Sequence, residues 1–135
     1  LYDPRQRVVA NVHSGWRGSI LDIAGKTVLA MQEKFGADPK KMIAGVGPSL
    51  GPCCAQFINY KEEIPETLWK YKLPDRDYFD FWALSRDQLL ETGVLDSNIE
   101  NMNICTRCSQ DRFFSYRGQR ITGRFACGLS LVGPG

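Results

Sequence analysis

The stretch RVVANVHSGWRG, residues 7–18, carries the clearest fold signal of the chain and also its only histidine. Residues 7–12 are mostly apolar and rich in valine, a composition that predicts a buried strand. After the loop HSGWRG, apolar side chains recur near helical spacing from Ile20 to Phe35, and Gly36 is a natural end for that helix. The stretch therefore predicts a strand–loop–helix unit with His13 in the loop.

The rest of the chain alternates strand-like and helix-like segments. Upstream, LYDPRQ predicts a strand end and a turn at Asp3-Pro4-Arg5. Because a strand that begins at residue 1 has no earlier partner, we expect further sequence before it in the complete protein. Asp80 is placed to cap a helix and Gly93 to end it. No repeat or linker is visible, so we expect one domain over residues 1–135. The other expected elements are strands at 42–46, 99–104, 113–118 and 124–132, a polar helix around 60–70 and the capped helix at 81–92.

The overall composition excludes several functional classes. The 135 residues are 43% apolar and carry a formal net charge of +2, with no run of Lys or Arg, which argues against a nucleic-acid partner. No apolar stretch is long enough to cross a bilayer and no signal-peptide pattern opens the chain, so no membrane partner is expected. The five cysteines are odd in number, and we interpret them as reduced thiols of a cytoplasmic protein.

His13 is the first candidate site residue. It lies where a strand gives way to a glycine-containing loop, and loops held by a rigid scaffold are common positions for ligand-binding groups. Gly15 and Gly18 permit a ligand to approach the backbone closely, and the Arg17 guanidinium can contact two oxygens of a phosphate at once. The alternative is that the imidazole of His13 only hydrogen-bonds to backbone groups.

Four of the cysteines occur in two motifs. In GPSLGPCC, residues 47–54, a thiolate of Cys53 or Cys54 paired with His13 would form a cysteine-hydrolase dyad, although free cysteines more often pack as small apolar side chains. CTRC at 105–108 is a CxxC motif, but a structural zinc site needs two more ligands and the chain has no second CxxC. A thioredoxin-like motif would open a helix, whereas this one precedes strand-like residues. We therefore expect this CxxC to be mainly structural.

The segment FFSYRGQRITGR, residues 113–124, interleaves aromatic residues with arginines. Such a segment can stack on a base and hold a phosphate. It also matches a twisted hairpin with a buried face and a turn near Gly118. Composition alone does not separate these two interpretations.

Taken together, these motifs resemble those of the YfiH/laccase-domain family. The family's members are described as purine nucleoside phosphorylases with adenosine deaminase activity. Its fold implies an α+β protein, with mixed β-sheets packed with helices in layers. The family's older multicopper-oxidase label does not suit this chain, because several coppers need many histidines and the chain has one. The resemblance covers nearly the whole chain and rests on HSGWRG at 13–18, GPSLGPCC at 47–54, Cys105-Thr106, FFSYRG at 113–118 and TGR at 122–124, in that order.

The resemblance also implies a metal site and a set of substrates. The family binds zinc through one cysteine and two histidines, and only the histidine of HSGWRG, His13, is present here. The other two ligands are expected upstream of Leu1, and none of the five cysteines corresponds to the family's cysteine ligand. Three ligands and an open position suit a catalytic zinc. The implied substrates are purine nucleosides (adenosine, inosine and guanosine) and phosphate. His13 and Arg17 are the candidate catalytic residues; Arg17 would orient the phosphate, and Ser49 and Arg117 would line the nucleoside pocket.

Two other hypotheses remain open. One is the cysteine hydrolase that pairs Cys53 or Cys54 with His13. The other is an inactive fragment that lacks two metal ligands, in which unpaired strand edges would favour self-association.

Overall fold

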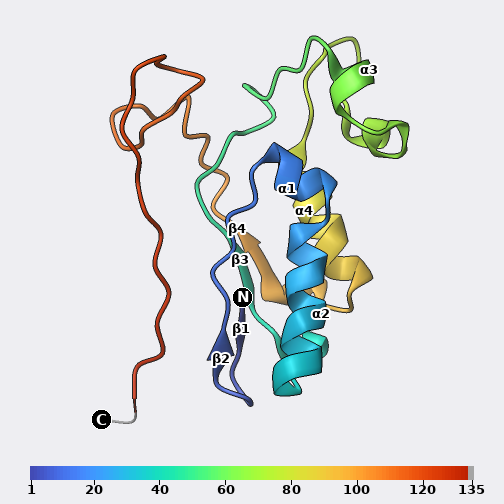
Figure 1. Ribbon diagram of the computed structural model, residues 1–135, viewed down its shortest axis with the longest axis vertical. Helices are drawn as coiled ribbons and strands as arrows, with labels where there is room; N and C mark the ends of the chain where they lie inside the picture. Colours follow the sequence, from blue (N-terminus) through green and yellow to red (C-terminus); the bar gives the residue numbers. More distant parts are fainter. Residues whose placement is uncertain (134–135) are drawn as a thin grey trace. The chain divides into compact units, whose positions relative to one another are not determined.

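The computed structural model describes residues 1–133 and has the α+β fold that the sequence predicts (Figure 1). These residues form two compact units: the first holds 1–45, 85–100 and the chain from 127, and the second holds 46–84 and 101–126. Each unit is assembled from separate stretches of sequence. The single domain expected over 1–135 stays a prediction, and its last residues, 134–135, lie outside the described part. No helix within residues 1–133 has the length and apolar character needed to span a bilayer.

The first unit opens with an antiparallel hairpin of β1 (Tyr2–Asp3) and β2 (Val8–Val9). The buried carboxylate of Asp3 holds the turn, because its Oδ1 accepts the backbone N–H of Arg5 at 2.8 Å and that of Gln6 at 3.1 Å. The predicted strand–turn–strand is confirmed, although its second strand is shorter than predicted.

The helix predicted to follow the loop HSGWRG begins inside that motif, at Trp16, and is two helices, α1 (Trp16–Ile20) and α2 (Ile23–Phe35). Asp22 separates them: its backbone is left-handed, with φ of 54°, and its side chain accepts the backbone N–H of Gly25 at 3.0 Å as the N-cap of α2. As predicted, α2 ends at Gly36, which takes the left-handed conformation with φ of 65°.

Helix α4 (Phe81–Glu91) has the ends that the sequence predicts. The Asp80 carboxylate accepts the backbone N–H of Ala83 at 2.9 Å, and Gly93 turns the chain with φ of 94°. The inner faces of α2 and α4 contribute to the buried core of the first unit. This core consists of Val28, Met31, Ala37, Met42, Ala44, Leu89, Val94 and Ile99.

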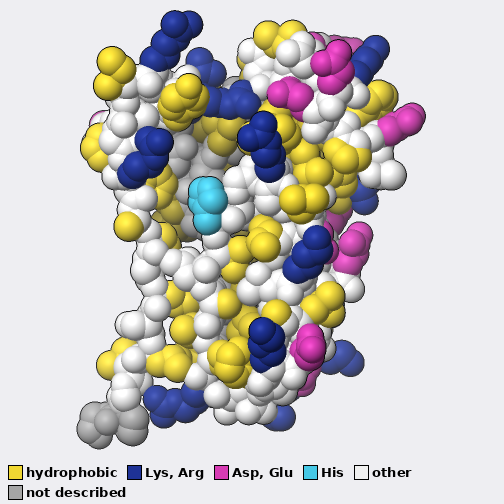
Figure 2. Space-filling model, viewed as in Figure 1, with side chains coloured by type: hydrophobic (Ala, Val, Ile, Leu, Met, Phe, Trp, Pro, Cys, Tyr) yellow, Lys and Arg dark blue, Asp and Glu magenta, His cyan; other side chains and the backbone are white. Residues whose placement is uncertain are grey.

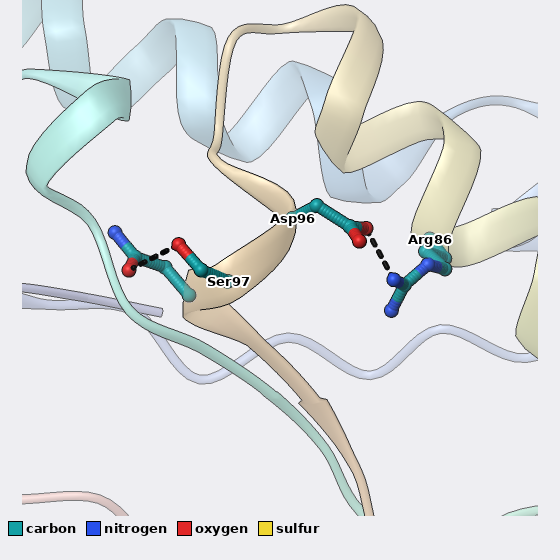
Figure 3. A network of polar contacts seen from close by, with 4 residues as sticks. Arg86, Asp96 and Ser97 are labelled. Carbon is teal, nitrogen blue, oxygen red and sulfur yellow. Dashed lines mark hydrogen bonds and ion pairs between the residues drawn. The ribbon is translucent and has the colours of Figure 1, made fainter.

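Short elements connect these parts of the first unit. They are the 3-10 helices η1 (Pro39–Lys41) and η3 (Asp96–Asn98). The backbone N–H of Asp38, the N-cap of η1, donates to Oδ2 of Asp3 at 2.8 Å, so one carboxylate ties the hairpin to a segment 35 residues away. Figure 3 shows the Arg86 side chain of α4 in an ion pair with Asp96 of η3.

The second unit has an aromatic core rather than an aliphatic one. The predicted polar helix around 60–70 is a short helix, α3 (Tyr60–Glu63), followed by a 3-10 helix, η2 (Glu66–Tyr71). Phe57 and Phe79 are both buried, and their rings meet edge-on with centroids 6.0 Å apart. The rings of Tyr60, Trp69 and Phe81 extend this cluster.

Two predicted strands are wrong, and two others are shortened. Residues 113–118 and 124–132 form turns and irregular backbone, because a segment with strand propensity makes a strand only when a partner accepts its hydrogen bonds. The strand predicted at 42–46 is β3 (Ala44–Val46), and the one at 99–104 is β4 (Ile99–Asn101). Within the described residues, β3 and β4 pair with each other and β1 pairs with β2.

Candidate functional site

The HSGWRG loop presents an exposed imidazole. His13 follows β2 and precedes α1, and its side chain, cyan in Figure 2, reaches the surface. Any Cβ on residue 15 would lie 3.3 Å from Nε2 of His13, so Gly15 leaves room for the imidazole. Oγ of Ser14 lies 3.0 Å from Oγ of Ser19, a hydrogen bond that ties the loop to α1. Within residues 1–133 the ring of His13 makes no hydrogen bond, so the backbone-bonded alternative is not what the structure shows.

Arg17, the second residue of α1, is also exposed. Its guanidinium carbon lies 4.7 Å from the centre of the Trp16 ring, in a cation–π contact. Stacking of this kind occupies the face of a guanidinium and leaves N–H donors on its edge for an anion. Trp16 is half-buried and therefore serves as a platform for Arg17.

The GPSLGPCC loop and the CTRC segment lie side by side in the second unit. Ser49 pairs with Cys105 in a parallel β-bridge: the Ser49 N–H donates to the carbonyl of Ile104 at 3.1 Å, and the Thr106 N–H donates to the carbonyl of Ser49 at 3.0 Å. The indole Nε1–H of Trp82 donates to Oγ of Ser49 at 2.6 Å. The Ser49 hydroxyl, which accepts this bond, keeps its own proton to donate.

This pairing brings four cysteines together. The sulfur atoms of Cys53, Cys54, Cys105 and Cys108 all lie within 4.8 Å of one another. Sγ of Cys108 is 3.6 Å from that of Cys53 and 3.5 Å from that of Cys54, and all four are free thiols. Cys54 and Cys105 are buried, whereas Cys53 and Cys108 are exposed. We call these four residues the thiol cluster.

The surroundings of the thiol cluster shift the pKa values of its members in opposite directions. Burial raises the pKa of the Cys53 and Cys54 thiols, and the neighbouring thiols add to this effect at Cys53. For Cys105, burial also disfavours the thiolate, but the N–H groups of Cys108, Gly51 and Arg107 outweigh it and lower the pKa to about 7.

The raised thiol pKa values bear on the cysteine-hydrolase hypothesis. A nucleophilic cysteine needs a lowered pKa, so neither Cys53 nor Cys54 has the environment of an activated nucleophile. Both lie in the second unit, whereas His13 lies in the first.

Arg117 is held by its own neighbours in the second unit. One of its guanidinium nitrogens donates to the backbone carbonyl of Gln56, and its guanidinium carbon lies 4.5 Å from the centre of the Phe57 ring. Partial burial lowers the pKa of Arg117. These contacts fix its side chain against the aromatic core.

The structure thus distributes the predicted site residues over both units. His13 and Arg17 lie in the first unit, and Ser49 and Arg117 lie in the second. The thiol cluster was not predicted from the sequence, because a zinc site that includes CTRC was expected to need a second CxxC motif. The adjacent pair Cys53-Cys54, in a loop shaped by two Gly-Pro steps, was a local signal, but it does not show which other cysteines lie beside it.

The fold and these loops define the chain as an α+β protein with an exposed histidine loop and a cysteine-rich loop pair. The family described as "Multi-copper polyphenol oxidoreductase laccase" matches residues 1–132, and the chain belongs to this family. The resemblance seen in the sequence motifs is therefore confirmed.

Relatives and solved structures agree with this assignment. The chain is 32% identical to a purine nucleoside phosphorylase of Bacteroides thetaiotaomicron, over 97% of this chain and 52% of that protein. It is 33% identical to the purine nucleoside phosphorylase YlmD of Geobacillus stearothermophilus, over 96% of this chain and 50% of that protein. The crystal structure of the Bacillus licheniformis hypothetical protein YfiH matches with a TM-score of 0.78 and 28% identity, over 88% of this chain and 48% of that one. The chain thus spans about half the length of the proteins it matches.

Proposed function

We propose that the protein is a zinc-dependent purine nucleoside phosphorylase that also deaminates adenosine, and that His13 is one of its zinc ligands. The observation that carries the proposal is the exposed imidazole of His13 in a loop of a chain whose relatives are named purine nucleoside phosphorylases. In phosphorolysis a phosphate oxygen attacks the anomeric carbon of the ribose, and the purine leaves with the electrons of the C–N bond. In deamination water adds to the amino-bearing carbon of adenine, and ammonia leaves.

The His13 loop fits a zinc ligand. Its imidazole is exposed, and Gly15 leaves room beside Nε2. A zinc ion with an open position supplies a polarised water or a Lewis acid at neutral pH. The proposed set includes a cysteine and a second histidine from sequence that precedes Leu1.

The remaining candidate residues bind and orient substrate in this proposal. Arg17, supported on Trp16, uses the N–H edge of its guanidinium to hold the oxygens of phosphate. The Ser49 hydroxyl accepts from Trp82 and can therefore donate its proton to a nucleoside oxygen or ring nitrogen. Arg117, fixed over Phe57, carries a positive charge with which it can bind the nucleoside. The free thiols agree with action in the reducing cytoplasm.

Variants of the complete protein test the zinc part of this proposal. His13→Ala is expected to lose one zinc equivalent per chain and turnover of both inosine and adenosine, with the circular dichroism spectrum unchanged. Purine release in the presence of phosphate, ammonia release and zinc content by mass spectrometry are the measurements. Full turnover after metal removal, or wild-type zinc content in His13→Ala, would refute it. Cys53→Ser tests the hydrolase hypothesis. That hypothesis predicts that the variant loses activity although the zinc site that includes His13 keeps its metal.

The phosphate role of Arg17 has its own test and a matched control. Arg17→Ala is expected to raise the KM for phosphate at least tenfold, since a charge-assisted bidentate contact is lost. Arg76→Ala removes the same charge from an exposed turn and is expected to leave this KM unchanged. An equal effect of the two variants on KM would show that Arg17 acts only through overall charge.

A further inference from the structure

We infer that the thiol cluster, Cys53, Cys54, Cys105 and Cys108, is a second metal site that holds a structural zinc ion. This site is separate from the one that includes His13, because it uses only side chains of the second unit. It belongs to a different chemical class as well, with four sulfur ligands and no nitrogen.

The spacing of the sulfur atoms fits a single tetrahedral ion. With Zn–S bonds of about 2.3 Å, the sulfur atoms of a regular tetrahedron lie roughly 3.8 Å apart. The separations of 3.5 and 3.6 Å from Cys108, and the limit of 4.8 Å over all pairs, bracket this value. A disulfide would need about 2.05 Å between two sulfurs. The ligands of an iron–sulfur cluster surround several metal atoms and lie further apart, so a mononuclear sulfur site is the better fit, and zinc is the common ion there.

Backbone hydrogen bonds hold the segments that carry the thiol cluster in a fixed arrangement. The bridge between Ser49 and Cys105 holds the two cysteine-bearing segments in register although they are more than fifty residues apart in sequence. The backbone N–H of Gly51 donates to Sγ of Cys105 at 3.3 Å, in a buried position. Such N–H···S bonds are the outer contacts that orient and stabilise a metal-bound thiolate.

Gly51 also shows that the two segments are pressed closely together. A Cβ at this position would lie 3.0 Å from Cβ of Cys105 and 2.9 Å from the Trp82 ring, so only glycine fits without displacement. The loop is therefore closely packed against the CTRC segment at Gly51. This approach places Cys53 and Cys54 next to Cys108.

A closed set of four thiolates suits a structural role. Four protein ligands leave no position for water or substrate, in contrast to a catalytic zinc with three. Binding converts the four thiols to thiolates and releases their protons to solvent. The zinc ion then joins the GPSLGPCC loop, which carries Ser49, to the CTRC segment.

Zinc stoichiometry in the complete protein tests this inference. Cys108→Ser is expected to lose one zinc equivalent per chain relative to wild type when the protein is purified with zinc and without chelator. Cys127→Ser removes an exposed cysteine outside the thiol cluster and is expected to keep the wild-type content. His13→Ala removes the other site only, so the double variant His13→Ala, Cys108→Ser is expected to lose two equivalents. Equal zinc content in Cys108→Ser and Cys127→Ser would overturn the inference.

Two further measurements, one on the wild-type protein and one on His13→Ala, keep the test decisive if Cys108→Ser does not fold. In alkylation followed by mass spectrometry, the four cysteines of the thiol cluster are expected to be protected in zinc-loaded protein and to react after chelation, whereas Cys127 reacts in both. X-ray absorption spectroscopy at the zinc edge of His13→Ala is expected to show sulfur atoms as the only ligands of the zinc ion. Prompt alkylation of all four thiols, a disulfide among them in freshly purified protein, or copper or iron in place of zinc would each overturn the assignment.

Discussion

The buried carboxylate of Asp3 offers a stability prediction that can be worked out from its contacts. Its two oxygens accept three backbone N–H groups, from Arg5, Gln6 and Asp38, at 2.8 to 3.1 Å. Asp3→Asn keeps one oxygen for the turn but places an amide group against the N–H of Asp38. A hydrogen bond to a charged group contributes about 1.5 to 3 kcal/mol, so we expect a loss of about 2 kcal/mol in the free energy of unfolding at pH 7. Asp3→Ala, which removes all three bonds, should lose about 4 kcal/mol.

The same carboxylate predicts a pH dependence of definite sign. Burial opposes the charge of Asp3, but the three N–H donors outweigh it, so the pKa is lowered in the folded protein. A lowered folded pKa stabilises the fold above the unfolded pKa of about 4, and this contribution disappears as pH falls through the folded value. The difference between wild type and Asp3→Asn should therefore be largest at pH 7 and should shrink toward pH 2.

Urea unfolding followed by circular dichroism, at several values of pH, measures both effects. Asp75→Asn is the matched control, because Asp75 is exposed in a turn and the substitution changes the net charge by the same amount. It should stay within about 0.5 kcal/mol of wild type. If Asp3→Asn unfolds with the wild-type free energy at pH 7, or if its deficit does not change on acidification, the argument from the three hydrogen bonds is wrong.

Three further predictions concern packing and charge. Met42→Ala should lower the free energy of unfolding by about 2 to 5 kcal/mol, because Met42 is 0% exposed in the core of the first unit. The control Met102→Ala, at a position that is 58% exposed, should change this free energy by less than about 0.5 kcal/mol in the same urea titration. Gly51→Ala should cost about 1 to 3 kcal/mol, because its Cβ would press on Cys105 and Trp82; a neutral result would show that the loop yields easily. Asp96→Ala should change the midpoint of thermal unfolding very little, since the ion pair with Arg86 is largely exposed and contributes less than about 1 kcal/mol.

Local signals in the sequence predicted the elements whose ends are set by single residues. Gly36, Asp80 and Gly93 each act through their own backbone or side chain, and the helix ends that they predicted are confirmed. Asp22 was missed as a helix boundary, because an aspartate in the left-handed conformation is uncommon and periodicity runs through it. The strands expected at 113–118 and 124–132 failed for a different reason: strand formation depends on a partner that a local pattern does not reveal.

The candidate site, too, was predicted from the sequence only in part. The motif HSGWRG predicted a loop that carries His13, and in the structure the side chains of His13 and Arg17 are both exposed. Their proposed roles in binding zinc and phosphate remain predictions. The thiol cluster could not be derived from spacing, because Cys53 and Cys108 are 55 residues apart and meet only through the bridge at Ser49.

The position of Trp82 gives the cysteine-bearing loop an optical reporter. Its indole donates to Ser49 and lies against Gly51, so its fluorescence senses the same backbone that carries Cys53 and Cys54. The other two tryptophans, Trp16 and Trp69, are placed on α1 and η2. Replacing those two with phenylalanine would leave a chain whose emission spectrum follows movement of this loop in real time, without an added dye and without touching a cysteine.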